Sequence, residues 1–210
     1  MLKKRLFTPG PTSVPEEILL EMAQPVMHHR TDEFKEIATL VLEDLKYVFQ
    51  TANDVLILAS SGTGAMESSF VNFLSPGEKV IVISGGKFGE RFREIASCYG
   101  LNIVRIDLEW GRTLSPGTVE KALLENPDAK AVFATLCETS TGTHFDIEEI
   151  SKAVSAREDT ILVVDAISAL GAVPCRTDRW KVDVVITGSQ KALMLPPGLA
   201  FISVSEKAWA

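Results

Sequence analysis

The residues of this chain with the clearest chemical potential are Asp165 and Lys191, which each follow an apolar run. Asp165 comes directly after Ile161–Val164, and a carboxylate at the end of a buried strand costs free energy unless a cation or a hydrogen-bond donor meets it. Lys191 stands beside a glycine turn, near apolar residues and two prolines, and such surroundings can lower the pKa of an amine and make it nucleophilic. Two alternatives stay open: an aspartate that caps the next turn, and a solvated surface lysine.

Small residues after another apolar run offer a site for an anion. Ser61, Gly62 and Thr63 lie in a turn that opens a helix, where free backbone N–H groups and the helix dipole attract phosphate. Simple helix capping explains the same residues. The turn matches neither a Walker A loop nor the Gly-x-Gly-x-x-Gly fingerprint, so a dinucleotide-binding dehydrogenase is not expected.

Two further turns carry Phe88 and Thr139. Phe88 lies among glycines after an apolar run, where its ring could stack on a planar ligand, although its spacing to Phe92 favours a shared core face. Thr139 belongs to a hydroxyl-rich segment, Cys137–Gly142, which could bind ligand oxygens or form an ordinary polar loop. Neither turn identifies a ligand by itself, so the case depends on where the fold brings them.

Composition and charge argue against several classes of protein. The 210 residues carry a net charge of −7 at pH 7, and the sequence has no basic stripe beyond Lys3–Arg5. An acidic chain repels phosphate backbones, so nucleic acid is not an expected partner. No apolar run approaches the roughly 20 residues that cross a bilayer, and prolines after the basic start break a signal-peptide pattern. The cysteines lie far apart and the histidines lack ligand spacing, so we expect no metal site and a cytoplasmic location.

The elements that must position these residues alternate between short apolar runs and longer amphipathic stretches. The predicted strands are Val55–Ala59, Lys79–Ser84, Ile103–Leu108, Ala131–Leu136, Thr160–Ala166, Val182–Thr187 and Ala200–Val204. The predicted helices are Thr31–Phe49, Phe88–Tyr99, Pro116–Glu125 and Ile147–Arg157, together with one that opens after Ser61. Thr31 or Asp32 is the expected cap of the first helix and Asp146 that of the last. This alternation predicts an α/β fold, a mostly parallel seven-stranded sheet with helices on both faces.

The last connection differs from the others. Gly188–Leu199 separates the final two strands, and it contains Pro196-Pro197-Gly198, which a crossover helix does not tolerate. One antiparallel strand is therefore expected.

In an open parallel sheet, ligands bind outside the carboxyl ends of the strands. Because the candidate residues follow strand ends, we expect them to share one edge of the sheet.

Taken together, these motifs resemble the class V pyridoxal-phosphate aminotransferases, the fold-type I branch that includes alanine–glyoxylate and serine–glyoxylate or serine–pyruvate aminotransferases. The similarity extends from Phe7–Thr12 through His28-His29-Arg30 to Gly188–Ala192 and Pro196-Pro197-Gly198. The combination is specific, whereas no single piece is. The resemblance implies pyridoxal 5′-phosphate as cofactor. It also implies transfer of an amino group from a small amino acid, such as alanine or serine, to a 2-oxo acid such as glyoxylate or pyruvate.

The resemblance also implies roles around the cofactor ring. Lys191 forms a Schiff base with the cofactor and then carries a proton, while Asp165 pairs with the pyridinium nitrogen and keeps the ring an electron sink. Phe88 stacks on one face of the ring, where relatives often carry tryptophan, and Ile167 presses on the other. Thr139 lies near the ring hydroxyl.

At the phosphate, and for the organisation of the whole protein, the resemblance implies a further set of features. The residues expected at the phosphate are Ser61, Gly62, Thr63 and Gln190. Gly10 borders the substrate pocket. The chain, 1–210 with an N-terminal arm at 1–30, corresponds to the cofactor-binding large domain of such a protein. The complete protein is expected to be a homodimer with a small C-terminal domain that holds the substrate carboxylate, so we expect weak or no turnover by this chain alone.

Alternatives remain open. An aminophosphonate transaminase shares much of the pattern. A cysteine desulfurase resembles it less, because it carries histidine at the positions of Phe88 and Gln190 and needs a reactive cysteine on a later loop. A catalytically silent fragment of the fold, acting as an interaction module, fits the elements equally well, but it gives no reason for Asp165 and Lys191 to meet at one edge.

Overall fold

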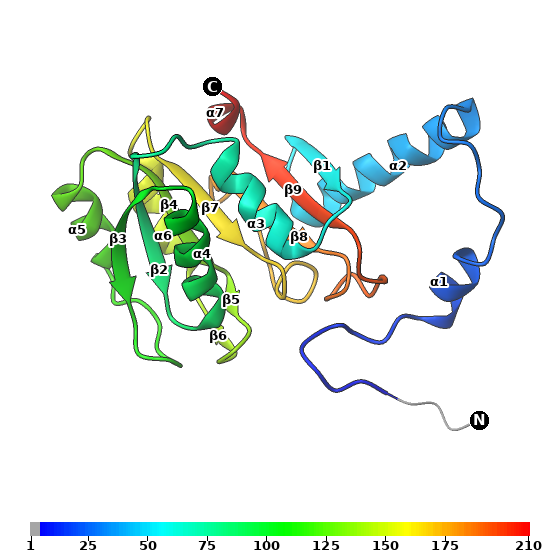
Figure 1. Ribbon diagram of the computed structural model, residues 1–210, viewed down its shortest axis with the longest axis horizontal. Helices are drawn as coiled ribbons and strands as arrows, with labels where there is room; N and C mark the ends of the chain where they lie inside the picture. The colour runs from blue at the N-terminus through cyan, green and yellow to red at the C-terminus, as the bar shows by residue number, and fades with distance from the viewer. Residues whose placement is uncertain (1–4) are drawn as a thin grey trace.

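A computed structural model describes residues 5–210, and its centre is one seven-stranded sheet (Figure 1). The strands are β1 (Asp54–Leu58), β2 (Lys79–Ser84), β3 (Asn102–Asp107), β4 (Ala129–Thr135), β7 (Ile161–Asp165), β8 (Val184–Gly188) and β9 (Ala200–Val204). Their order is β1-β9-β8-β7-β4-β2-β3; β9 is antiparallel to both neighbours and the other neighbouring pairs are parallel. The predicted sheet is therefore confirmed, and every predicted strand lies within two residues of the observed bounds.

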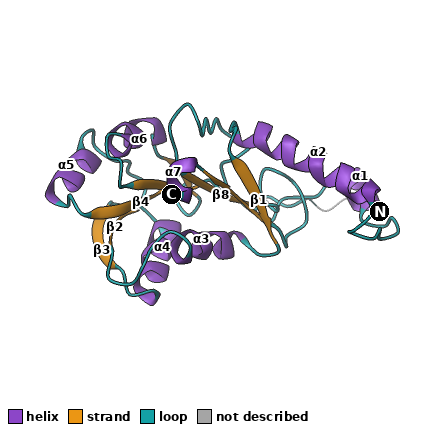
Figure 2. Cartoon of the chain, turned by 90° about the horizontal axis from the view of Figure 1, so that it is seen from above, coloured by secondary structure: helices purple, strands orange, loops and turns teal. Residues whose placement is uncertain are grey.

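Helices cover both faces of this sheet, as predicted (Figure 2). The helices are α1 (Glu16–Glu21), α2 (Asp32–Phe49), α3 (Gly62–Val71), α4 (Lys87–Cys98), α5 (Thr118–Glu125), α6 (Ile147–Ser155) and α7 (Glu206–Trp209). Helices α3 and α4 pack on one face, while α5, α6 and the C-terminal end of α2 pack on the other. The α/β architecture with two helical layers follows from this arrangement.

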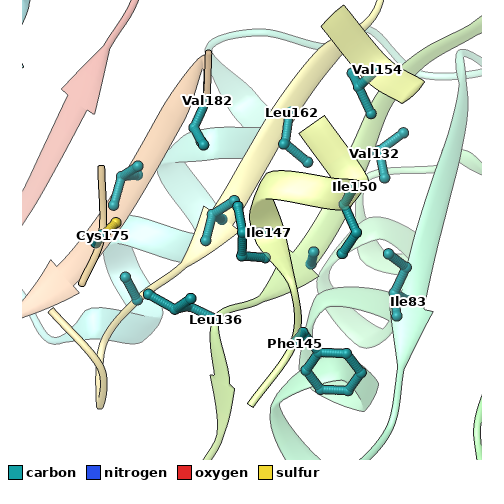
Figure 3. Close-up of a cluster of buried hydrophobic side chains, with 14 of the residues drawn as sticks. Ile83, Val132, Leu136, Phe145, Ile147, Ile150, Val154, Leu162, Cys175 and Val182 are labelled. Atoms are coloured by element: carbon teal, nitrogen blue, oxygen red, sulfur yellow. The ribbon is translucent and has the colours of Figure 1, made fainter. Parts of the chain in front are cut away.

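The central strands are apolar on both faces because both faces are buried. In β4, Val132 and Ala134 contribute to the core beneath α5 and α6, while Ala131 and Phe133 contribute to the core beneath α3 and α4. Successive side chains of a strand point to opposite faces, so a strand covered on both sides needs no polar alternation. Figure 3 shows the first of these cores, in which Phe145 and other side chains lie close together beside the sheet.

Local capping fixes where two of the helices begin. The Thr31 hydroxyl accepts a hydrogen bond from the Phe34 backbone N–H at 3.3 Å, so Thr31 rather than Asp32 is the N-cap of α2. Asp146 accepts from the Glu149 backbone N–H at 2.9 Å, which confirms the predicted cap of α6. Such caps satisfy backbone donors that the helix itself leaves unpaired.

Two elements were not predicted. Helix α1 lies in the segment before α2, and a short hairpin, β5 (Cys137–Glu138) with β6 (Thr143–His144), replaces the expected loop after β4. The hairpin brings Thr139 close to the end of the sheet. Residues 1–4 of the expected N-terminal arm, including Lys3 and Lys4, lie outside the described residues.

Much of α2 extends away from the sheet (Figure 1), and the apolar face that predicted it is only partly buried. Leu45 and Phe49 lie in the core. The exposed apolar side chains are Phe34, Ile37, Leu40, Val41 and Leu42. No helix in residues 5–210 is long and apolar enough to cross a membrane.

A core substitution tests this packing. The Phe133 ring is 0% exposed and stacks on Phe70 with ring centroids 4.1 Å apart. We expect Phe133→Ala to lower the free energy of unfolding by about 3–5 kcal/mol, because it removes buried surface and leaves a cavity. Phe7→Ala is the matched control, since the Phe7 ring is 93% exposed, and should change it by less than about 0.5 kcal/mol. Denaturant titration measures both; equal losses would contradict the assigned core.

Candidate active site

The candidate residues gather at the carboxyl edge of the sheet. Asp165, the last residue of β7, lies between Thr135 of β4 and Ile186 of β8. The segments that follow β4 and β8 carry Thr139 and Lys191, and those that follow β2 and β1 carry Phe88 and the turn of small residues. The strands concerned run parallel, so their ends meet at one edge, which is where such sheets bind ligands.

Asp165 is the buried acid of this edge. Asp165 is only 4% exposed, and its Oδ1 accepts a hydrogen bond from the Ile167 backbone N–H at 2.8 Å. Burial raises the pKa of Asp165 to about 7; the negative charge of Glu138 adds to this, and the Ile167 N–H, Lys191 and Arg91 oppose it. Asp165 therefore accepts a hydrogen bond from the turn that follows it, and it is also a buried carboxyl group without full charge compensation.

Lys191 faces this acid from the loop that follows β8. Partial burial lowers its pKa, and the nearby charge of Asp165 opposes that shift. The loop is fixed by its own hydrogen bonds: Ser189 Oγ donates to the Pro196 carbonyl at 2.6 Å, and the Leu195 N–H donates to the Ser189 carbonyl at 3.0 Å. Lys191 is thus a half-buried amine on an ordered loop, not a solvated surface lysine.

The N-terminal arm holds the same loop from the other side. The Thr12 N–H donates to the Gln190 carbonyl at 3.0 Å, and the Thr12 hydroxyl donates to the Lys191 carbonyl at 2.8 Å. A Cβ atom at Gly10 would lie 2.5 Å from Lys191 Nζ. Gly10 therefore lets the arm approach the amine, and a side chain at this position would displace the Lys191 side chain.

The turn of small residues approaches the buried acid through Ile167. A Cβ atom at Gly62 would lie 2.5 Å from Ile167 Cδ1, so glycine allows the start of α3 to pack against this side chain. Ser61 is the N-cap residue of α3, but its side chain makes no capping hydrogen bond. Capping therefore does not explain Ser61, and its hydroxyl is available at the positive end of the α3 dipole.

Phe88 and Phe92 have different surroundings, contrary to the shared core face that their spacing favours. Phe92 is fully buried and its ring lies 5.1 Å from that of Phe133. Phe88 is half-buried, and the Arg91 guanidinium lies 5.2 Å from its ring centroid. Phe88 is thus at the rim of the site, while Phe92 belongs to the core.

Three residues near the site were missed by the sequence analysis: Arg91, Ser168 and Glu138. Arg91 Nη1 donates to Thr63 Oγ1 at 3.3 Å, which places a positive charge beside the turn of small residues. Ser168 accepts from Thr139 Oγ1 at 2.8 Å and donates to the Cys137 carbonyl at 3.2 Å. Glu138 is fully buried beside the start of α4. Arginine three residues after Phe88 was visible as a helical neighbour, whereas nothing in the sequence indicated the other two contacts.

Comparison with known proteins agrees with this arrangement. Residues 6–210 match the sequence model of the family described as Aminotransferase class-V. The chain belongs to the class V aminotransferase family. The α/β fold and the family that the motifs resemble are both confirmed.

The relatives of this class V chain have more than one name. It is 48% identical over 99% of its length to a protein named soluble hydrogenase, small subunit, of Synechococcus sp. (strain PCC 6716), and covers 54% of that protein. It is 38% identical over 98% of its length to a serine–glyoxylate aminotransferase of Methylorubrum extorquens, of which it covers 52%. The alanine–glyoxylate aminotransferase structure from Nostoc sp. superposes with a TM-score of 0.93 at 30% identity, covering 100% of this chain and 55% of that one. The chain thus spans about half the length of these relatives.

The pKa of Asp165 makes the stability of this class V chain, without added cofactor, depend on pH. Below about pH 4 the folded and unfolded chains both hold the proton; towards pH 7 the unfolded chain releases it while the folded chain keeps it, so ionisation then opposes folding. We expect the free energy of unfolding of Asp165→Asn, relative to wild type, to increase between about pH 4 and pH 8. The difference should reach on the order of 4 kcal/mol by pH 8 and should be absent below about pH 4. Urea titration at several pH values measures the difference, with the exposed Asp159→Asn as control. A difference that does not vary with pH would refute the assignment.

Proposed function

We propose that the protein containing this chain is a pyridoxal 5′-phosphate-dependent aminotransferase that moves an amino group from a small amino acid to a 2-oxo acid such as glyoxylate or pyruvate. The observation that carries the proposal is the placement of a half-buried amine, Lys191, and a buried acid, Asp165, at one edge of the sheet. Relatives named serine–glyoxylate and L-aspartate–glyoxylate aminotransferase support this reaction class. A silent module has no need of this pair.

The residues present fit a flat, phosphorylated pyridine ring. The N-terminus of α3, with Thr63 and Arg91 beside it, suits an anion. Gln190 Oε1 is buried and lacks a hydrogen-bond partner among the described residues, so this amide is available for a ligand group. The half-buried ring of Phe88 lies at the rim, and Ile167 lies beside Gly62 next to Asp165. Charge, an aromatic surface and an unsatisfied polar atom all occur where the resemblance expects the cofactor.

When bound, the cofactor supplies an aldehyde carbon that reacts with amines and a ring that withdraws electrons. Lys191 contributes an amine whose lowered pKa leaves more of it unprotonated, and therefore nucleophilic, near neutral pH. The same Nζ could also take up and return a proton beside the substrate. Asp165, with a pKa of about 7, could hold either a proton or a negative charge toward the ring nitrogen of a bound cofactor.

The remaining groups bind and orient. Thr139 Oγ1 donates to Ser168 and could accept a hydrogen bond from a ring hydroxyl, and Ser61, Gly62 and Thr63 offer backbone N–H groups and hydroxyls for the phosphate. Gly10 lies against Lys191 Nζ, so the N-terminal arm would border a substrate that binds at this amine.

The proposal includes the organisation of the complete protein. We place residues 1–210 in the cofactor-binding large domain and assign the clamp for the substrate carboxylate to a small C-terminal domain, since the relatives are about twice as long as the matched region. A homodimer is part of the proposal and would cover the exposed apolar face of α2. The unpaired cysteines, Cys98, Cys137 and Cys175, agree with a cytoplasmic location.

The covalent site can be located directly. We expect pyridoxal 5′-phosphate followed by borohydride reduction to label Lys191 in preference to exposed lysines such as Lys181 and Lys87, because burial lowers the pKa of Lys191. Mass spectrometry of the digest identifies the labelled peptide, and Lys191→Ala is the control that should lose it. Scattered labelling in a longer form of the protein, with the C-terminal region included, would reject the proposal. Amino-donor assays with alanine, serine, aspartate, aminophosphonates and cysteine then separate the substrate classes.

The acid is tested by its effect on cofactor affinity. We expect Asp165→Ala to weaken cofactor binding by roughly 10- to 100-fold, because a charge-assisted hydrogen bond to the ring nitrogen is lost. Asp183→Asn is the matched control: Asp183 is a buried carboxylate at the opposite end of β8, where it accepts from the Leu162 N–H at 2.8 Å. Spectroscopic titration gives both affinities. Unchanged affinity in Asp165→Ala would favour the silent interaction module.

A further inference from the structure

Glu138 is a buried carboxylate that the proposed reaction does not use. It is the second residue of the short strand β5, it is 0% exposed, and both of its oxygens accept hydrogen bonds. Oε2 accepts from the backbone N–H groups of Phe88 and Gly89, each at 3.1 Å. Oε1 accepts from Ser140, at 2.6 Å from Oγ and 3.2 Å from the N–H. Burying a carboxylate costs free energy unless hydrogen-bond donors surround it, and these hydrogen bonds offset that cost for Glu138.

These hydrogen bonds make Glu138 the cap of a helix to which it does not belong. The N-cap residue of α4 is Gly86, which has no side chain, so the first backbone donors of α4 need a partner from elsewhere. Glu138 provides that partner from β5, although it lies 50 residues after Phe88 in the sequence. Its negative charge also lies at the positive end of the α4 dipole, which favours the contact.

Close packing leaves this contact little freedom. A Cβ atom at Gly86 would lie 2.5 Å from both Glu138 Cγ and Ser140 Oγ. A Cβ atom at Gly89 would lie 2.7 Å from the backbone of Ile83 and Ser84 at the end of β2. The first turn of α4 is thus confined between the end of β2 and the side chain of Glu138, and Phe88 lies between the two confined glycines.

The same carboxylate also fixes the turn after β5. Ser140 bonds to Glu138 through its N–H and hydroxyl, and Ser140 Oγ in turn accepts from the Lys87 N–H at 3.0 Å. Thr139 lies between Glu138 and Ser140. One buried side chain therefore sets the relative position of two segments that carry candidate cofactor contacts, the start of α4 with Phe88 and the turn with Thr139.

We propose that Glu138 is a positioning residue, whose carboxylate fixes the first turn of α4 so that the Phe88 ring is held ready for a planar aromatic ligand. This inference rests on the proposed function, because it takes Phe88 as the stacking surface for the cofactor ring. Glu138 acts through Phe88 and touches no reacting atom. Phe88 is half-buried at the first turn of α4, with the Arg91 guanidinium 5.2 Å from its ring centroid, so its orientation depends on the backbone that carries it.

A double-mutant cycle on cofactor affinity tests the link between the two residues. Glu138→Gln keeps the size of the side chain but turns one acceptor into an NH₂ donor, which then opposes either the α4 N–H groups or Ser140. We expect Glu138→Gln and Phe88→Ala each to raise the Kd for pyridoxal 5′-phosphate by about tenfold. In the Phe88→Ala background, Glu138→Gln should add less than about twofold, since the residue through which it acts is gone.

The control separates positioning from a general loss of stability. Asp183→Asn also alters a buried, hydrogen-bonded carboxylate, but at the far end of the strands, where Ser205 and Lys207 contact it. We expect it to lower the midpoint of thermal unfolding and to leave the Kd within about twofold, alone or with Phe88→Ala. If Glu138→Gln does not fold, Ser140→Ala replaces it, because that change removes the 2.6 Å bond to Glu138 and leaves the carboxylate in place.

Two results would overturn the inference: a Glu138 variant with unchanged Kd, or effects of the Glu138 and Phe88 substitutions that multiply in the double variant. The proposed function fails in a different way, since wild-type protein would then show no specific label at Lys191. The cycle is run in protein whose label at Lys191 has been demonstrated, so the two failures remain distinct.

Discussion

The burial of one carboxyl group, that of Asp165, is the constraint around which the rest of the site is arranged. Asp165 ends a strand whose preceding residues are apolar and covered on both faces, with β4 and β8 on either side. It is almost fully buried, and its single capping N–H from Ile167 does not compensate for the lost hydration, so its pKa rises to about 7. A cationic or proton-sharing partner at this edge would therefore bind strongly.

The residues around Asp165 satisfy this constraint through close backbone approach. Gly62 allows the start of α3 to lie against Ile167, next to the acid, and Gly10 allows the N-terminal arm to lie against Lys191. Larger residues at either position would have to displace the side chain of Lys191 or Ile167. Four segments that are distant in sequence thus lie close together: the N-terminal arm, the start of α3, the turn after β7 and the loop after β8. Each is held by a hydrogen bond or a steric fit that involves backbone atoms.

The sequence predicted the parts of this arrangement that depend on local pattern. The apolar strands, the capped helices and the residues after the strands were all visible, and the two prolines before β9 indicated the antiparallel strand. Asp165 and Lys191 were found because strand ends meet at one edge of a parallel sheet. These inferences need only periodicity and the known behaviour of α/β sheets.

What the sequence did not predict depends on contacts between distant segments. Spacing placed Phe88 and Phe92 on one face, but only the packing of Phe92 against Phe133 and the exposure of Phe88 separate them. Glu138 was invisible because its partners on α4 are backbone N–H groups, which carry no signature in the side-chain sequence. Helix α1 is short and buries none of its residues, so it produced no amphipathic period.

The pKa shifts of Asp165 and Lys191 point in opposite directions, and this has a consequence for how charge enters the site. Desolvation lowers the pKa of the lysine and raises that of the acid, so burial shifts each group toward its neutral form. A neutral acid beside a ring nitrogen can share its proton with that nitrogen, so positive and negative charge would form together, without an isolated charge being buried. Arg91 and the α3 dipole lie near the other end of the expected ligand, where a phosphate brings its own negative charge. A ligand with a phosphate at one end and a basic ring nitrogen at the other would meet Arg91 beside Thr63 and the proton-sharing acid Asp165, and this pairing favours one orientation.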